Sequence, residues 1–341
     1  MPGSENLDRF LGPGISTPTS QQTRTAVTNA TTSQPALRAP RRLGDRVFSI
    51  AATTSGVVIL IVLAAVAIFL VSKSVPALVA SDKEVTDVGM SFWSNIGPLV
   101  FGTIWAAALA LLIAVPFAIS IALFISHYAP RRIAQGLGYA IDLLAAIPSV
   151  VYGLWGIMVL APAVQPIYVW LVDNVGWFPL FAGPVSGTGR TVLTVAIVLS
   201  VMILPIITAL SREIFLQTPR LHEEAALALG ATKWEMIKMA VLPFGRPGII
   251  SATMLGLGRA LGETMAVAMV LSPAVIVSFA LLQSQNPTTI AANIALNFPE
   301  AHDLGVNVLI ATGLVLFIIT LIVNSLARFI VNRRKAFSGA N

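Results

Sequence analysis

The chain has 341 residues, of which 56% are hydrophobic and 11% are charged, and its mean hydropathy is +0.85. Soluble domains carry roughly 25% charged residues, so this composition excludes an ordinary soluble protein and predicts an integral membrane protein. Because the chain has no cysteine, disulfide frameworks, thiolate nucleophiles and cysteine metal sites are also excluded. The formal net charge of +6 would suit nucleic acid, but the positions of the basic residues indicate otherwise.

Apolar runs divide the chain into segments. Residues 1–45 form a polar, basic cytoplasmic leader that we expect to be disordered, because its composition cannot bury enough apolar surface to fold. Residues 46–335 are expected to form one all-α transmembrane domain, followed by a short tail at 336–341. A bilayer needs about 20 apolar residues per helix. The sequence predicts six spans, at about 47–72, 97–126, 139–162, 191–211, 248–277 and 304–327.

Lysine and arginine are distributed unequally between the segments that join these spans. Six lie in or next to the leader, two follow the second span, five follow the fourth span and four lie in the tail. The loops on the opposite side hold three, which are Lys73, Lys83 and Arg190. By the positive-inside rule, both termini are expected in the cytoplasm.

Two long loops are predicted on the outer side, at about 163–190 and 278–303. The first contains Trp170, Trp177 and Phe178, and aromatic side chains of this kind prefer the membrane interface. We expect a short surface helix there. The loop serves either as an interfacial anchor or as a docking site for an external partner, and its composition leaves both open.

The inner loop at 212–247 has the residues of an ordered helical element. Thr218 is the expected N-cap of a helix with Pro219 at its first position, and Gly230 is its expected terminator. A second helix is predicted to start at a capping box formed by Thr232 and Glu235 and to stop at Pro243.

Acidic and small residues crowd the first of these inner-loop helices. They are Glu223, Glu224, Ala225, Ala226 and Ala228. Small side chains let another surface approach the helix backbone, and the carboxylates can address a basic partner. An ordinary amphipathic surface helix explains the same composition, so the residues alone leave both interpretations open.

The segment GLGRALGETMAV, residues 256–267, places Arg259 and Glu263 inside the fifth predicted span. A central arginine costs roughly 2.5–3.5 kcal/mol on insertion scales, and arginine cannot lose its proton when buried. On a continuous helix the two charges lie one turn apart on one face, where they can pair. One hypothesis is a structural ion pair. The hypothesis we favour is a translocation path, in which Arg259 meets an oxyanion and Glu263 holds the arginine when the path is empty.

Ser149 and Tyr152 follow Pro148 in the third predicted span, where the proline is expected to kink the helix. Their hydroxyl groups can satisfy the backbone carbonyls that the kink frees, or they can contact a polar substrate. The structural role is the simpler interpretation, and the substrate path is the alternative.

Motifs for catalysis do not occur in the sequence. The chain has neither a GxxxxGK[ST] phosphate-binding loop nor an HExxH metal motif, and its three histidines are scattered. We therefore expect that this chain is not an enzyme and holds no cofactor or metal of its own.

The stretch EAALALGATKWEMIKMAVLP, residues 224–243, resembles the signature loop of ABC importer permeases. The matching positions are Glu224, Ala225, Ala226, Gly230, Leu242 and Pro243. One departure is Ala240, where the family usually has isoleucine. Two further segments, AAIPSVVYGLWG at 145–156 and GLGRALGETMAV, resemble the phosphate-specific permeases of the PstC type. The resemblance covers roughly residues 45–335.

The resemblance implies a type I ABC importer permease fold in the bacterial inner membrane and a role in phosphate import. It assigns Glu223, Glu224, Ala225, Ala226 and Gly230 to coupling with a cytoplasmic ATPase. It also implies a second, homologous permease, two ATPase subunits that bind ATP and Mg, and an external phosphate-binding protein. The alternatives are an ABC permease for sulfate or molybdate and a gradient-driven anion carrier.

Overall fold

The structure is a computed structural model that describes residues 43–80 and 92–335, with side chains up to residue 330. In this part of the chain six helical segments are long and apolar enough to cross a membrane, as predicted. They are Leu43–Val79, Phe92–Tyr128, Ser149–Val175, Val192–Leu216, Lys233–Leu261 and Leu304–Ile330. The predicted disordered leader and the tail lie outside the described residues, except that residues 43–45 already belong to the first helix.

The helix α1 (Leu43–Val79) is apolar and exposed along most of its length, as expected for a helix that faces lipid. The chain divides at Val58 into two compact units, and everything from Ile59 onward belongs to the larger unit. At the end of α1, Ala77 packs with Phe92 and Val308 in a small cluster.

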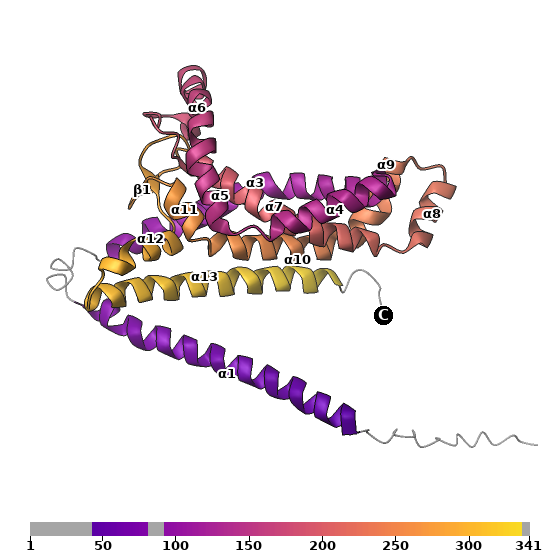
Figure 1. Cartoon of the computed structure of the whole chain (residues 1–341), viewed down its shortest axis with the longest axis horizontal. Coiled ribbons are helices and arrows are strands. Elements are labelled where there is room, and N and C mark those ends of the chain that lie inside the picture. Colours follow the sequence, from indigo (N-terminus) through magenta and orange to yellow (C-terminus); the bar gives the residue numbers. More distant parts are fainter. Residues whose placement is uncertain (1–42, 81–91, 336–341) are drawn as a thin grey trace, which may run out of the picture. The chain divides into compact units, whose positions relative to one another are not determined.

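The helix α7 (Val192–Leu216) is the most buried of the six spans and carries the core of the larger unit. Its side chains at intervals of one turn are at most 1% exposed: Val195, Leu199, Ile203 and Ile207. The helix α3 (Phe92–Leu123) packs along α7 with a row of buried alanines, which allow the two backbones to approach closely. The helix α10 (Leu242–Leu261) packs on α7 as well, and α13 (Leu304–Lys335) lies alongside α10 (Figure 1).

The third span differs from the prediction of 139–162. A separate amphipathic helix, α4 (Arg131–Ala145), ends before Pro148, and the span itself comprises α5 (Ser149–Trp155), a π turn at Gly156–Leu160 and α6 (Ala161–Val175). Pro148 is the N-cap of α5 and does not kink a continuous helix. The physical reason is that proline disfavours the helical conformation of the residue before it. The predicted outer loop after this span therefore begins later, and α6 takes up its first part.

The three π turns among the described residues each end two residues before a proline. Phe124–Tyr128 precedes Pro130, Gly156–Leu160 precedes Pro162, and Ile237–Val241 precedes Pro243. The third turn joins α9 (Lys233–Met236) to α10, so the prediction that Pro243 stops the helix is wrong. A proline lacks the N–H group and presses on the carbonyl one turn back. A turn with i→i+5 hydrogen bonds contains an extra residue and lets the helix continue past Pro162 and Pro243, whereas the helix that ends in Tyr128 stops at the extended Ala129.

The fifth span ends earlier than the predicted 248–277. The helix α10 stops at Leu261, and after a break the short helix α11 (Met265–Val270) follows. The segment beyond it, residues 271–303, is called the outer segment after its predicted side. It contains two-residue parallel strands, β1 (Pro273–Ala274) and β2 (Asn286–Pro287), and the helix α12 (Ile290–Asn297). The all-α prediction is therefore correct apart from this small strand pair.

Candidate functional site

Arg259 and Glu263 do not share a continuous helix. Arg259 lies in the last turn of α10, Gly262 is the C-cap, and Glu263 belongs to the break before α11. The predicted placement of both charges on one helical face is therefore wrong. The cause is local: glycine at 262 weakens the helix, and the Glu263 carboxylate, which is 7% exposed, accepts a hydrogen bond from the Ala266 N–H at 3.1 Å.

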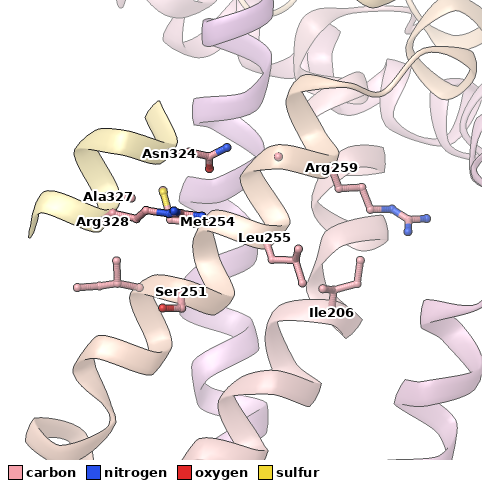
Figure 2. A pocket seen from close by; sticks show the side chains of 10 residues that line it. Ile206, Ser251, Met254, Leu255, Arg259, Asn324, Ala327 and Arg328 are labelled. Carbon is pink, nitrogen blue, oxygen red and sulfur yellow. The ribbon is translucent and has the colours of Figure 1, made fainter. Parts of the chain in front are cut away.

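Within the described residues, Arg259 and Glu263 form no ion pair with each other. The one contact there within ion-pair distance joins His127 and Glu223, and it is an ion pair only with a protonated histidine. The Nε atom of Arg259 is buried and has no hydrogen-bond partner among the described residues. Its guanidinium extends from α10 on the side opposite to the arginine at 328 (Figure 2). Arg259 is thus a cation in a membrane-spanning segment whose charge the chain leaves open to an anion.

Tyr152 lies close enough to Arg259 for the guanidinium charge to act on its hydroxyl group. The same hydroxyl donates a hydrogen bond of 2.9 Å to the Leu144 carbonyl at the end of α4. Tyr152 therefore bonds a backbone carbonyl as predicted, although no kink frees that carbonyl, and it lies within reach of the charge of Arg259. Ser149 is the first residue of α5 and is half-buried.

The helices α5 and α11 pack closely because α5 has glycine at the contact. A Cβ atom at Gly153 would lie 3.0 Å from the Cα of Ala266 and 3.1 Å from the sulfur of Met269. This contact places Gly153, the residue after Tyr152, against α11 near the end that Glu263 caps. The structure thus gathers Tyr152, Arg259 and Glu263 in one region of the spans.

The sequence interpretation overlooked Arg190, which it used only in counting charges. The Nη2 atom of Arg190 donates to the carbonyls of Met269 at 3.2 Å and Leu271 at 2.9 Å, and its Nε donates to Val270 at 3.3 Å. These are the carbonyls at the end of α11, where a cation is favourable. The signal in the sequence was an arginine on the side of the membrane that is otherwise poor in cations.

Asn286 completes this arrangement, which we call the outer clamp (Arg190 and Asn286). The side chain is fully buried, and its Oδ1 accepts from the Val192 N–H at 2.9 Å. Its Nδ2 donates to the carbonyls of Arg190 at 3.1 Å and Ser284 at 3.2 Å. The outer clamp therefore joins the start of α7, the outer segment and the end of α11. No sequence motif indicated it, because its partners are distant in the chain.

A cavity of about 810 Å³ lies between α7, α10 and α13 (Figure 2). Arg259 contributes to its lining from α10, and Asn324 and Arg328 contribute from α13. Ile206 and Met254 are among its apolar residues. Among the described residues that line the cavity none is acidic, and Arg328, which points toward α10, is the arginine whose charge faces it, since the guanidinium of Arg259 extends the other way (Figure 2).

The predicted inner loop forms the helix α8 (Arg220–Ala228), which follows α7 in the chain. Its N-cap is Pro219, in an extended conformation, and so the prediction of Thr218 as the N-cap is off by one residue. Gly230 terminates the helix as predicted, with φ of +84°. The N–H of Gly230 bonds to the Leu227 carbonyl and that of Ala231 to the Ala226 carbonyl, which makes a Schellman motif. The predicted capping box of Thr232 and Glu235 is present.

The two faces of α8 have different surroundings. On the inner face, Glu223 Oε1 lies 3.5 Å from Nε2 of His127, which follows α3, and Ala226 packs on a cluster that includes Phe215 and Ile237. Glu224 and Ala225 are exposed on the opposite face of the helix, which faces away from the rest of the chain. Exposed leucines flank them, since Leu221 is 75% exposed and Leu229 is 89% exposed. Of the predicted coupling residues, Glu223 and Ala226 thus anchor the helix, whereas Glu224, Ala225 and Gly230 are accessible.

The described residues contain no group of three or more histidine, aspartate or glutamate side chains that could hold a metal ion. The chemistry available at the candidate site is therefore the binding of an anion by arginine and by hydroxyl and amide groups.

Known proteins resemble this chain in sequence and in fold. The family of binding-protein-dependent transport system inner membrane components matches residues 114–336. The chain is 46% identical over 302 residues to the phosphate transport system permease protein PstC 2 of Mycobacterium tuberculosis, covering 85% of this chain and 93% of that protein. It is 40% identical over 315 residues to PstC of Mesorhizobium japonicum, covering 87% and 93%.

Among solved structures, a bacterial ABC transporter involved in the import of the acidic polysaccharide alginate has a TM-score of 0.55 with 18% identity. The match covers 85% of this chain and 96% of that chain. At this identity the likeness bears on the fold alone.

Proposed function

We propose a function from the premise that this chain belongs to the family of binding-protein-dependent transport system inner membrane components and, within it, to the PstC phosphate transport permeases. It is a multi-pass membrane protein with the fold of a type I ABC importer permease. Its function is to form half of the path through which an ATP-driven importer moves inorganic phosphate across the bacterial inner membrane.

The observation that carries this proposal is the unneutralised Arg259 in the fifth span, whose Nε is buried and whose charge acts on Tyr152. A cation in a membrane-spanning segment is unfavourable without a counter-charge. A phosphate ion supplies that charge, and its oxygen atoms match the planar fork of the guanidinium. Glu263 caps α11 only four residues later, so its negative charge stays near and limits how long an anion remains. Tyr152 and Ser149 are the neighbouring polar groups of the path.

Coupling to ATP hydrolysis is assigned to α8. Its exposed face, with Glu224 and Ala225, docks on a cytoplasmic ATPase subunit that binds ATP and Mg. Its inner face is joined to the end of α3 by the His127–Glu223 pair, and the chain continues through α9 and the π turn directly into α10. A displacement of α8 therefore reaches Arg259 along one continuous helical segment.

The complete importer contains further chains. A homologous permease forms the other half of the path, so the permease pair is a heterodimer, and two ATPase subunits dock beneath it. A phosphate-binding protein docks on the outer segments, where Trp170 and Trp177 are 59% and 81% exposed. Both termini and α8 lie in the cytoplasm, because the basic residues concentrate on that side.

Two alternatives differ in substrate or in energy source. Sulfate and molybdate are oxyanions that an arginine also binds, but the similar proteins are named as phosphate transport permeases, which favours phosphate. A gradient-driven carrier has no use for an ATPase-docking helix, whereas this chain has one with a terminating glycine and an exposed apolar surface.

The test is radiolabelled phosphate uptake in cells without importers of their own. The chain is expressed with its partner permease and binding protein, with and without the ATPase subunit. We expect uptake only when the ATPase is present, and no competition from excess sulfate or molybdate. Equal uptake without the ATPase would refute the ABC mechanism. Strong competition by sulfate or molybdate would change the substrate and keep the mechanism.

A further inference from the structure

The cavity between α7, α10 and α13 contains a second cation that transport at Arg259 does not account for. Arg328 reaches from α13 across the cavity toward Met254 of α10 (Figure 2). Asn324 precedes it by four residues, so both side chains lie on one face of α13. In the part of the chain that the structure describes, neither side chain has a hydrogen bond or an ion pair.

The cavity lies next to the proposed translocation path at Arg259. Ser251 also lines it and precedes Arg259 by eight residues on α10, a distance of about 12 Å along the helix. The cavity therefore extends from the level of Arg259 toward the end of α10 that we place in the cytoplasm. Ser251 itself provides no free proton, because its hydroxyl donates to the Pro247 carbonyl at 3.0 Å.

Charge defines the kind of ligand that this cavity accepts. Arg328 faces it, no acidic group is among its described lining residues, and the guanidinium of Arg259 extends away from Arg328. Apolar walls strengthen the field of an uncompensated charge. Arg328 offers a planar fork of N–H donors and Asn324 offers an amide N–H group one turn away. This donor set fits the oxygen atoms of a phosphate group.

An orientation signal alone would also explain an arginine near the inner end of a span. The side chain of such an arginine can point in any direction in which its guanidinium reaches water or the lipid headgroups. Arg328 and Asn324 are exposed, but Arg328 points toward the neighbouring helix and lines the cavity (Figure 2).

We propose that Arg328 and Asn324 form a second phosphate-group site at the inner end of the cavity, separate from Arg259. The group is either inorganic phosphate on its way out of the path or the headgroup of an anionic phospholipid. In the first case the proposal rests on the proposed function and gives the anion a second contact after Arg259. In the second case the site holds a lipid against α10 and is independent of the substrate.

The experiment uses the assembled transporter with both permeases, the ATPase and the binding protein. ATP-driven phosphate uptake is measured in vesicles of phosphatidylcholine, with or without phosphatidylglycerol, at rising phosphate concentrations on the cytoplasmic side. Retention of phosphatidylglycerol by the purified complex is measured by native mass spectrometry. The variants are Arg328→Gln, Arg328→Lys and Asn324→Ala. Arg132→Gln is the matched control, because Arg132 is exposed on α4 and does not line the cavity.

If the ligand is inorganic phosphate, internal phosphate inhibits import, and Arg328→Gln needs about tenfold more of it for half-inhibition, because a charge-assisted hydrogen bond is lost. Asn324→Ala shifts inhibition in the same direction, and Arg328→Lys shifts it less. If the ligand is a lipid, the complex retains phosphatidylglycerol, import by the parent depends on it, and Arg328→Gln loses both properties.

The proposal is overturned if Arg328→Gln and Asn324→Ala match the parent and the Arg132→Gln control in inhibition and in lipid retention. A parent transporter that imports no phosphate at all would refute the proposed function instead. The lipid measurement then still decides for or against the site, because it requires no transport.

Discussion

Arg259 has a buried Nε without a hydrogen-bond partner among the described residues, in a helix that spans the membrane. Glu263 does not neutralise it, since its carboxylate is occupied at the start of α11. Uncompensated charge at this depth raises the free energy of the empty transporter. Binding of an anion lowers it again, so the unfavourable empty state itself favours substrate entry.

We predict that Arg259→Gln lowers phosphate uptake by about 10- to 100-fold, since hydrogen bonds to a charged group contribute roughly 1.5–3 kcal/mol. Arg259→Lys retains the charge without the planar fork and is expected to have intermediate uptake. Copurification of the ATPase measures assembly, which should persist.

Arg246→Gln is the control for this prediction, because it removes an exposed arginine from the same helix. Uptake by Arg259→Gln at the level of this control would show that the arginine is not part of the path. Loss of copurification would instead assign Arg259 a structural role.

Among the helical elements, α8 depends on a backbone conformation that L-residues adopt unfavourably. Gly230 has φ of +84°, and no atom lies within 4 Å of the position where a Cβ atom would stand. The constraint within this chain is therefore conformational and not steric. It fixes the direction in which the chain leaves α8 and enters α9.

We predict that Gly230→Val weakens copurification of the ATPase by about 5- to 30-fold, because the left-handed conformation costs a non-glycine residue roughly 1–2 kcal/mol. Gly230→Asn is the matched variant, since asparagine tolerates positive φ. It should retain most of the binding and of the ATP-dependent uptake. Equal losses in both variants would indicate contact with the partner surface and not backbone strain.

The helix α11 has six residues and is held at both ends by side chains, by Glu263 at its start and by Arg190 at its end. A helix of this length has little stability of its own. The outer clamp therefore holds the end of α11 in place.

We predict that Arg190→Gln lowers the free energy of unfolding in detergent by roughly 1.5–3 kcal/mol, because hydrogen bonds from a charged group to three carbonyls are lost. A denaturant titration measures this effect. Lys73→Gln, which removes an exposed cation from α1 on the same predicted side, should leave stability unchanged. Similar stability in both variants would contradict the role of the outer clamp.

At the scale of the whole molecule, Trp177 follows the third span and α8 follows the fourth, so the two are predicted on opposite sides of the membrane. The chain has no cysteine, so single cysteines report the two sides without background. Leu229 is 89% exposed and Trp177 is 81% exposed, and both positions are therefore accessible to a reagent in water.

We predict that a membrane-impermeant maleimide labels Trp177→Cys in intact cells and labels Leu229→Cys only in inverted vesicles. Bound ATPase should protect Leu229→Cys and leave Trp177→Cys reactive. Labelling of Leu229→Cys in intact cells would reverse the proposed orientation, and with it the cytoplasmic position of α8.

The sequence by itself determined those features that depend on interactions between residues close together in the chain. The number of spans, the capping box at Thr232 and the termination of α8 at Gly230 followed from the sequence, because apolar length, capping and positive φ act within a few residues. The resemblance of the inner loop and of the Arg259 segment to known permeases indicated the family in the same way.

Tertiary structure decided where helices end and which charges are paired. Arg259 and Glu263 have spacing suited to an ion pair on a continuous helix. The helix breaks at Gly262, however, and Glu263 caps α11 and does not pair with Arg259. The outer clamp and the Arg328 cavity join residues that are distant in the chain. Hydrogen bonds and cavities of this kind depend on how helices pack, and no local pattern encodes them.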